Sequence, residues 1–292
     1  MAVRCACLTS GVRCCRSGQI QSDVGQLTVI AHVGNASVAY DDIGEGTPVV
    51  FLHAFPLDRR MWAPQTSALA GQRRCLTIDT RGFGGSTAVG PFSVDRYADD
   101  VAAVLDAAGV TRAVVVGLSM GGYVAFALWR RQPGRVRALV LADTRAGEDS
   151  PETRDRRREL IHVAQTEGSV AVAELQLIGL VGKTTRERRP DIVHGVRENA
   201  VRASVDGTIG ALEALIARPD STPTLSSISV PTLIVVGEED VLTPPKEARA
   251  IHALVFGSRL EVLAQAGHLS NVERPAAFNA VLGEFLSAIE SD

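Results

Sequence analysis

The chain has 292 residues, of which 46% are hydrophobic and 22% are charged, so it can bury a full core and does not have the composition of a disordered protein. Its formal net charge of −3 argues against a nucleic-acid-binding protein, which usually carries a basic face. No apolar run approaches the roughly 18 residues that cross a bilayer, so we expect no membrane span.

The first 22 residues form a basic leader without acidic residues or a long apolar run, which argues against a secretory signal. Four of the five cysteines lie in it: Cys5, Cys7, Cys14 and Cys15. Their spacing lacks the paired C-x₂-C of metal sites and no histidine lies nearby, so we predict a disordered leader over 1–22 and no metal site. Only Cys75 remains elsewhere, which is typical of a reducing compartment and favours a cytoplasmic location.

Short apolar runs along the chain predict the strands of a sheet. Residues 27–33 and 36–41 predict an antiparallel hairpin around Gly34-Asn35. Later runs are continuous in Val, Ile and Leu, which is typical of strands buried on both faces of a parallel sheet. These later runs are 48–52, 75–78, 113–116, 138–141, 232–236 and 260–263.

Segments with helical periodicity alternate with these runs. They are residues 62–70, 94–108, 120–131, 246–255 and 276–289. Ser93 stands directly before the second segment, in the position of a helix N-cap. The alternation predicts an α/β fold with a mostly parallel, doubly wound sheet.

The alternation stops over residues 145–224, which have helical patterns, no strand-like run and no Phe, Tyr or Trp. A charged segment opens this stretch at 148–159, and we interpret it as a solvated helix face. We therefore predict a helical cap over 145–224, inserted into an α/β core made of 23–144 and 225–292.

A G-x-S-x-G motif, Gly117 to Gly121, lies between the predicted strand 113–116 and the helix that follows it. A tight turn in this context lifts a serine hydroxyl clear of the sheet at a helix N-terminus, where backbone N–H groups favour developing negative charge. This context predicts Ser119 as a nucleophile.

A serine nucleophile needs a base, and in this architecture the base follows the nucleophile and the acid in the chain. His268 lies in a glycine-containing loop after the strand 260–263, at the carboxyl end of the sheet, where α/β sites form. His252 falls within a predicted helix and is interpreted as a helix-face residue. We therefore predict His268 as the base.

The acid should also follow a strand. Asp240 comes directly after the strand 232–236 and is our choice to hold the imidazole in the required tautomer. Asp143 follows the strand 138–141 in a workable position and remains an alternative.

Two backbone N–H groups should form an oxyanion hole. One belongs to Met120, the residue after the nucleophile, and the second comes from the loop 53–57, where Phe55 is the candidate. His53 in the same loop precedes the nucleophile and is interpreted as a residue that organises the loop.

A mostly apolar pocket is expected beside these residues. The candidate substrate-binding residues are Phe55, Trp62, Leu177, Ile178 and Val241. Gly182-Lys183-Thr184 resembles the end of a P-loop, but it lacks the earlier glycine and the preceding strand, so we predict no phosphate site there.

Five motifs, LHAFP, DTRGFGGS, GLSMGG, GEEDVLTPP and AGHLSNVERP, stand in the order and spacing of the α/β-hydrolase superfamily, which the chain resembles over about residues 25–287. Residues 141–146 and 182–185 are similar to the 3-oxoadipate enol-lactonase branch. The segment 53–56 is more similar to general esterases and cofactor-free haloperoxidases. Haloalkane dehalogenases carry Asp at the nucleophile position, so Ser119 argues against dehalogenation.

The resemblance implies a serine hydrolase that acts on a small-molecule ester or lactone without a metal or cofactor. Two alternatives stay open. One is perhydrolysis, as in the haloperoxidase-like enzymes, or C–C bond hydrolysis in the same pocket. The other is a hydrolase-fold ligand receptor with little turnover. The sequence leaves the oligomeric state open.

Overall fold

The computed structural model describes residues 20–21 and 27–291 of the chain. Of the predicted leader 1–22, only Ile20–Gln21 are described, and they pair with the next strand as the short strand β1. The rest of the leader, with its four cysteines, lies outside the described residues.

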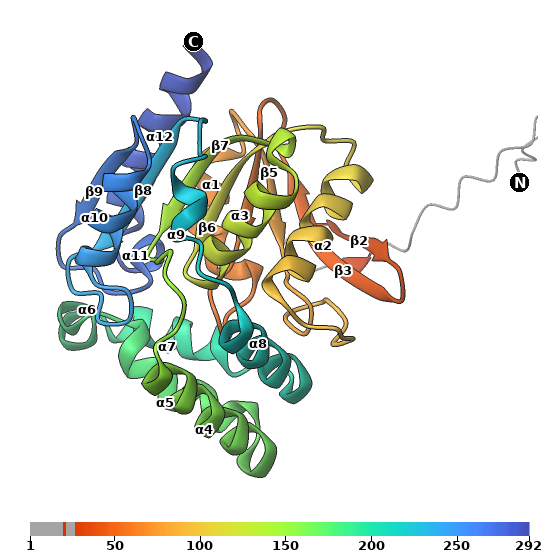
Figure 1. Ribbon diagram of the computed structural model, residues 1–292, viewed down its shortest axis with the longest axis vertical. Coiled ribbons are helices and arrows are strands. Elements are labelled where there is room, and N and C mark those ends of the chain that lie inside the picture. Colours follow the sequence, from red (N-terminus) through yellow and green to blue (C-terminus); the bar gives the residue numbers. More distant parts are fainter. Residues whose placement is uncertain (1–19, 22–26, 292) are drawn as a thin grey trace, which may run out of the picture.

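A nine-stranded sheet forms the centre of the described part of the chain, in the order β1-β2-β3-β5-β4-β6-β7-β8-β9 (Figure 1). The strands are β1 (Ile20–Gln21), β2 (Leu27–Val33), β3 (Ala36–Ile43), β4 (Pro48–Leu52), β5 (Arg74–Ile78), β6 (Ala113–Leu118), β7 (Val136–Ala142), β8 (Thr232–Gly237) and β9 (Arg259–Leu263). Strands β4 to β9 are parallel, whereas β1, β2 and β3 pair antiparallel at one edge. The mostly parallel α/β sheet and the hairpin at Gly34-Asn35 are thus confirmed.

Helices cover both faces of this sheet. Outside the segment between β7 and β8, they are η1 (Arg59–Trp62), α1 (Ala63–Leu69), α2 (Val94–Ala107), α3 (Met120–Arg131), η2 (Pro133–Arg135), α10 (Pro245–Leu254), α11 (Ser270–Glu273) and α12 (Pro275–Ser291). Helices α2, α3 and α10 share one apolar core, and α1 and α12 share the other. As predicted, Ser93 caps α2 by accepting a hydrogen bond from the N–H of Arg96.

The continuous apolar runs in the strands serve both cores. In β4, Val50 and Leu52 belong to the core under α2 and α3, whereas Val49 and Phe51 belong to the core under α12. Side chains of a strand alternate between the two faces, so a strand covered on both sides needs apolar residues at every position. This requirement explains why the central strands are visible as unbroken runs in the sequence.

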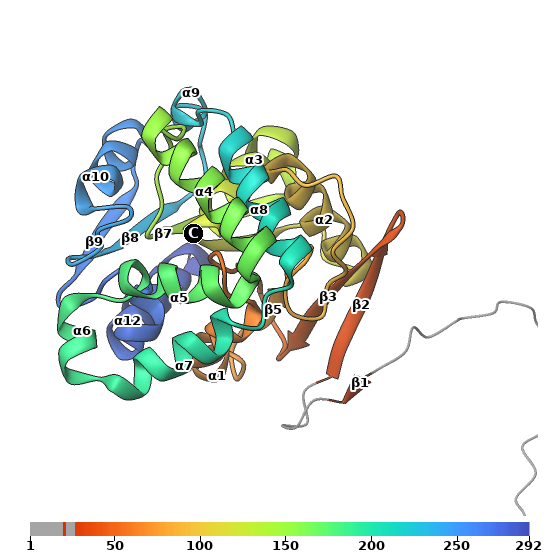
Figure 2. The ribbon, with the colours of Figure 1, turned by 90° about the horizontal axis from the view of Figure 1, so that it is seen from below.

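Between β7 and β8, where a helical cap over 145–224 was expected, the chain forms helices and no strand, and we call this segment, from residue 145 to the end of α9, the insert. Its helices are α4 (Pro151–Glu167), α5 (Ser169–Leu180), α6 (Lys183–Arg188), α7 (Pro190–Ala200), α8 (Val205–Ala217) and α9 (Thr222–Leu225). Seen from below, α4, α5, α7 and α8 lie across one end of the molecule (Figure 2). The insert lies very close to the loop after β5. The distance is so short that a Cβ on Gly207 would collide with the backbone of Gly82.

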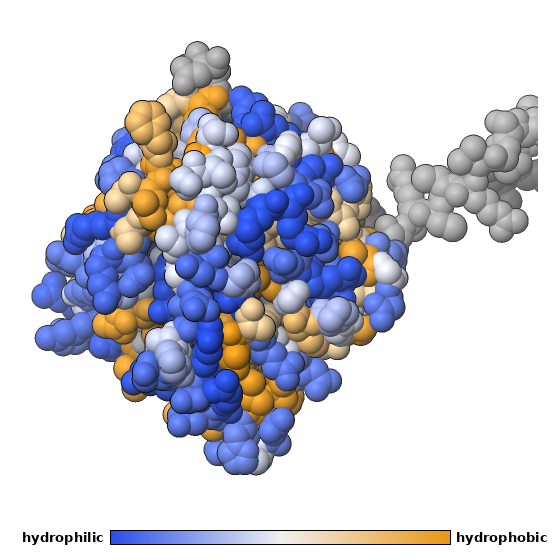
Figure 3. Space-filling view, viewed as in Figure 1, coloured by the Kyte–Doolittle hydropathy of each residue, from blue (hydrophilic) through white to orange (hydrophobic). Residues whose placement is uncertain are grey.

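Hydrophilic residues cover most of the face shown in Figure 3, with smaller apolar areas between them. Among the described residues, no helix is both long and apolar enough to span a bilayer.

Candidate active site

Ser119 occupies a sharp turn between β6 and α3, with φ of 54° and ψ of −112°. Such left-handed values are strained for a residue with a Cβ and are common at functional sites. The flanking glycines make the turn possible, since a Cβ on Gly117 would collide with the carbonyl of Gly121, and a Cβ on Gly121 with the carbonyl of Leu52. The turn therefore aims Ser119 outward at the start of α3.

Replacing Gly121 by alanine should destabilise the protein by about 2–3 kcal/mol, because the new methyl group must displace the backbone of β4 at Leu52. The measurement is urea unfolding of the variant. Gly195→Ala in α7 is the control, since nothing lies within 4 Å of its Cβ position and alanine favours a helix. Equal stability of the two variants would contradict the close approach.

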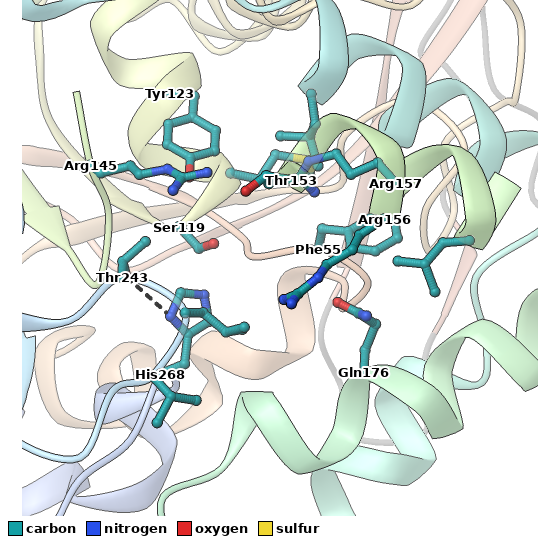
Figure 4. A pocket seen from close by; sticks show the side chains of 15 residues that line it. Phe55, Ser119, Tyr123, Arg145, Thr153, Arg156, Arg157, Gln176, Thr243 and His268 are labelled. Carbon is teal, nitrogen blue, oxygen red and sulfur yellow. Dashed lines mark hydrogen bonds between the residues drawn. The ribbon is translucent and has the colours of Figure 1, made fainter. Parts of the chain in front are cut away.

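His268 lies in the loop between β9 and α11 and is hydrogen bonded through Nδ1 to Asp240 Oδ2, at 2.8 Å. The Thr243 hydroxyl donates to the same carboxylate oxygen at 2.7 Å and lies 3.2 Å from His268 Nδ1 (Figure 4). Asp240 accepts at Oδ1 from the N–H groups of Leu242 and Thr243. With an ionised Asp240 as acceptor, Nδ1 carries the proton, which leaves Nε2 unprotonated as a base requires.

Asp240 is buried, and burial alone raises the pKa of a carboxyl group. Electrostatic attraction to the His268 ring and the hydrogen bonds from His268 and Thr243 outweigh that effect, so the pKa of Asp240 lies below its usual value. Asp240 is therefore ionised at neutral pH.

Asp143, the alternative acid, is held elsewhere. Its Oδ1 accepts from the N–H of Gly237 at 2.8 Å and its Oδ2 accepts from the Ser270 hydroxyl. Burial and the nearby charge of Asp240 raise the pKa of Asp143 well above its usual value. These bonds join the ends of β7 and β8 to α11, so Asp143 supports the loop of His268, whereas Asp240 is the carboxylate that is hydrogen bonded to the ring.

His53 organises the loop after β4, as expected. The N–H of Thr80 donates to His53 Nε2 at 2.9 Å, so the proton lies on Nδ1, which bonds the carbonyl of Ala54 at 3.0 Å. Burial lowers the pKa of His53 to about 4. His53 is therefore neutral near pH 7 and joins the loop that carries Phe55 to the loop after β5.

Because His53 has a lowered pKa when folded, its stabilising effect is present above about pH 6.5 and is lost as the pH falls towards 4. As the pH falls through that window, His53 should lower the free energy of unfolding by up to about 3 kcal/mol. In His53→Gln this component should be missing, so the profile of unfolding free energy against pH should be flatter. Burial raises the pKa of Asp79, so Asp79 changes the free energy of unfolding with pH in the opposite direction. This contribution is the same in the wild-type protein and in His53→Gln. Parallel profiles for the two proteins would contradict the role of His53.

A pocket of about 340 Å³ lies between the carboxyl end of the sheet and the insert, and both Ser119 and His268 line it. Figure 4 shows the Ser119 side chain above the His268 ring at the edge of this pocket. Three more of the candidate site residues, Phe55, Met120 and Val241, also line it. Met120 is the first residue of α3, so its N–H has no acceptor within the helix.

The other predicted pocket residues lie elsewhere. Trp62 is fully buried in the core under α12, where it packs 5.1 Å from Phe51 and 6.2 Å from Phe278 between ring centroids. Leu177 packs on the same core, and Ile178 is 70% exposed on the outside of α5. The apolar residues of α5 are distributed around the helix, so its sequence does not reveal which face turns to the pocket, and Gln176 is the residue of this helix that lines it.

The charged segment 148–159 is not only a solvated face. Thr153, Arg156, Arg157 and Leu160 line the pocket, together with Arg145. The four residues of α4 have the i, i+3, i+4, i+7 spacing of one helix face, which is the signal that identifies them. Tyr123, Leu215, Leu242 and Thr243 also line the pocket.

The Gly182-Lys183-Thr184 segment of the insert is hydrogen bonded to residues beside the loop of His268. The buried Glu273 of α11 accepts from the N–H groups of Gly182 and Gly267, both at 2.9 Å. A Cβ on Gly267 would collide with Gly182, so the two backbones touch. Glu239 accepts from the N–H and the hydroxyl of Thr184. We call this arrangement the Gly182 clasp.

A family model described as the alpha/beta hydrolase fold matches residues 47–275 of the chain. The chain belongs to the α/β hydrolase family. This α/β hydrolase is 31% identical over 232 residues to 3-oxoadipate enol-lactonase 2 of Acinetobacter baylyi, covering 79% of this chain and 85% of that protein.

Two solved structures are also similar to this α/β hydrolase. A thermophilic esterase from Thermogutta terrifontis is 35% identical with a TM-score of 0.86, covering 90% of this chain and 98% of that one. The enol-lactonase from Burkholderia xenovorans LB400 is 32% identical with a TM-score of 0.83, covering 89% of this chain and 100% of that one.

Proposed function

We propose that this α/β hydrolase cleaves a small carboxylic ester or lactone, with Ser119 as nucleophile, His268 as general base and Asp240 as the acid that orients it. The observation that carries the proposal is the bond from His268 Nδ1 to Asp240, which leaves Nε2 free in the pocket that contains Ser119. Relatives named as an esterase and as enol-lactonases support ester or lactone hydrolysis in general.

Acylation begins when the Ser119 hydroxyl oxygen attacks the carbonyl carbon and its proton passes to His268 Nε2. The oxyanion accepts hydrogen bonds from the N–H of Met120, at the start of α3, and from the N–H of Phe55. As the tetrahedral intermediate collapses, the bond to the alcohol oxygen breaks and that oxygen takes the proton from His268. In a lactone the alcohol stays attached as the other end of the acyl chain.

Deacylation repeats these steps with water as the nucleophile. His268 removes a proton from water, the hydroxide attacks the acyl carbon, and Ser119 leaves with the proton. The helical insert acts as a cap that supplies one wall of the pocket through α4, α5 and α8.

The experiment is a screen of p-nitrophenyl esters of graded acyl length together with simple lactones and free dicarboxylic acid monoesters. Acid release is followed by pH-stat, and a serine-directed phosphonate is mapped by peptide mass. We expect turnover of at least one ester or lactone class and labelling at Ser119. A single turnover without release of the acid would instead favour a ligand receptor.

A further inference from the structure

The Gly182 clasp holds the backbone on both sides of His268. Glu273 Oε1 accepts from the N–H of Gly267 at 2.9 Å and from the N–H of Leu269 at 3.2 Å, the two neighbours of His268 in the chain. Glu273 Oε2 accepts from the N–H of Gly182 in the insert, at 2.9 Å. One buried carboxylate therefore connects the insert to both residues that flank the general base.

A second carboxylate makes the same kind of connection beside Asp240. Glu239, which directly precedes Asp240, accepts from the N–H of Thr184 at 2.7 Å and from the Thr184 hydroxyl. The backbone before Asp240 also touches the backbone before His268, since a Cβ on Gly237 would collide with the carbonyl oxygen of Gly267. The segments that carry the acid and the base thus meet the insert at one point.

The hydrogen bonds of Glu273 define a position more closely than apolar packing would. Among the described residues, no cation forms an ion pair with this buried side chain, so its oxygens depend on the three backbone N–H groups. Catalytic groups must be held within about 0.5 Å of their productive geometry. A misplacement of about 1 Å can cost on the order of 10²-fold in rate.

We propose that the insert segment Gly182–Thr184 positions the acid–base pair, and that Glu273 is a positioning residue that acts through His268. This inference rests on the proposed function, in which His268 Nε2 must reach the Ser119 hydroxyl. The insert then has a role besides forming a wall of the pocket. Its bonds to Glu273 and Glu239 determine where Nε2 lies.

The first test is Gly182→Ala, which removes no hydrogen-bonding group. Alanine adopts the φ of −60° and ψ of 156° of this residue without strain. Its methyl group would lie 2.7 Å from the nitrogen of Gly267 and 2.8 Å from Glu239 Oε2, so it must push the insert away from the loop. We expect kcat on the best substrate to fall about tenfold, with KM changed by less than about twofold. Gly195→Ala in the insert is the matched control, because nothing lies within 4 Å of its Cβ position.

The second test is Glu273→Gln. The amide oxygen can still accept from the two neighbours of His268, but the NH₂ group now faces the N–H of Gly182, and two donors cannot bond each other. We expect a similar fall in kcat with little change in KM. Glu238→Gln is the matched control, because this exposed side chain accepts from the N–H of Gln265 outside the clasp.

A spectroscopic measurement separates this inference from the proposed chemistry. The proton on His268 Nδ1, which bonds Asp240, is followed by NMR and assigned by its loss in His268→Ala. Its chemical shift should change in Gly182→Ala and in Glu273→Gln and stay the same in both control variants. Failure of the parent to hydrolyse any ester or lactone would contradict the proposed function, while this resonance would still decide the positioning role.

The melting temperature of each variant is recorded in parallel. A lower melting temperature with unchanged kcat and an unchanged Nδ1 resonance would overturn the inference, because the clasp would then only stabilise the fold. If Glu273→Gln does not fold, Gly182→Ala decides by the same two measurements.

Discussion

Replacing Ser119 by alanine should lower kcat on esters or lactones by about 10⁴ or more without unfolding the protein. The hydroxyl oxygen is the only heavy atom removed, and in the proposed mechanism it is the atom that forms the acyl-enzyme bond. Alanine must adopt the same positive φ as serine, so the strain of the turn is unchanged. Stability should therefore hardly change.

The measurement is kcat on the best substrate from the screen, with the melting temperature recorded in parallel. Ser258→Ala is the control, because this serine lies after α10, away from the pocket, and bonds His252. Ser119→Gly adds a second readout. Since glycine adopts positive φ without strain, this variant should be inactive and slightly more stable than the parent. Full activity of either Ser119 variant would exclude this residue as the nucleophile.

Asp240→Asn should lower kcat by about 10³–10⁴, whereas Asp143→Asn should leave most of the activity. In the proposed mechanism, an amide at position 240 cannot supply the negative charge that stabilises the His268 cation. If its NH₂ group faces His268 Nδ1, the ring is held in the wrong tautomer. At position 143 the amide oxygen can accept from Gly237 and the amide NH₂ can donate to the Ser270 hydroxyl, so the hydrogen bonds are replaced.

Both variants are compared by kcat at neutral pH, with circular dichroism to show that each is folded. The two residues are a fair pair because both are buried carboxylates next to the same loop. If Asp143→Asn proved the more damaging change in kcat, the acid would have to be placed at the end of β7 and the hydrogen bond of Asp240 would be structural.

The strands and the serine turn were predictable because local sequence determines them. Unbroken runs such as 113–116 must be covered on both faces, and only glycine fits beside the turn at 117 and 121. The pocket wall was not predictable in the same way. Helical periodicity separates apolar buried residues from polar exposed ones, so Arg156 and Arg157 were assigned to the solvent-facing side of the helix. A pocket that is partly lined by polar side chains cannot be recognised by this criterion.

Trp62 shows a related limit. A large aromatic residue near a predicted oxyanion loop is equally compatible with the core and with the site, and only the packing against Phe51 and Phe278 decides between them. The contact between Asp149 and Arg218 joins residues that are distant in the sequence, so no local pattern reveals it.

The Gly182 clasp divides the insert into two parts that differ in how far their sequence can vary without affecting the loop of His268. The part before it, α4 and α5, supplies the pocket side chains of the insert except Arg145 and Leu215. The clasp itself supplies no pocket side chain and holds the insert to Glu273. Residues 151–180 are therefore the part of the insert where a substitution acts most directly on the pocket. Substitutions at the positions of α4 and α5 that line the pocket should change which substrate is accepted, whereas the loop of His268 stays held by the clasp.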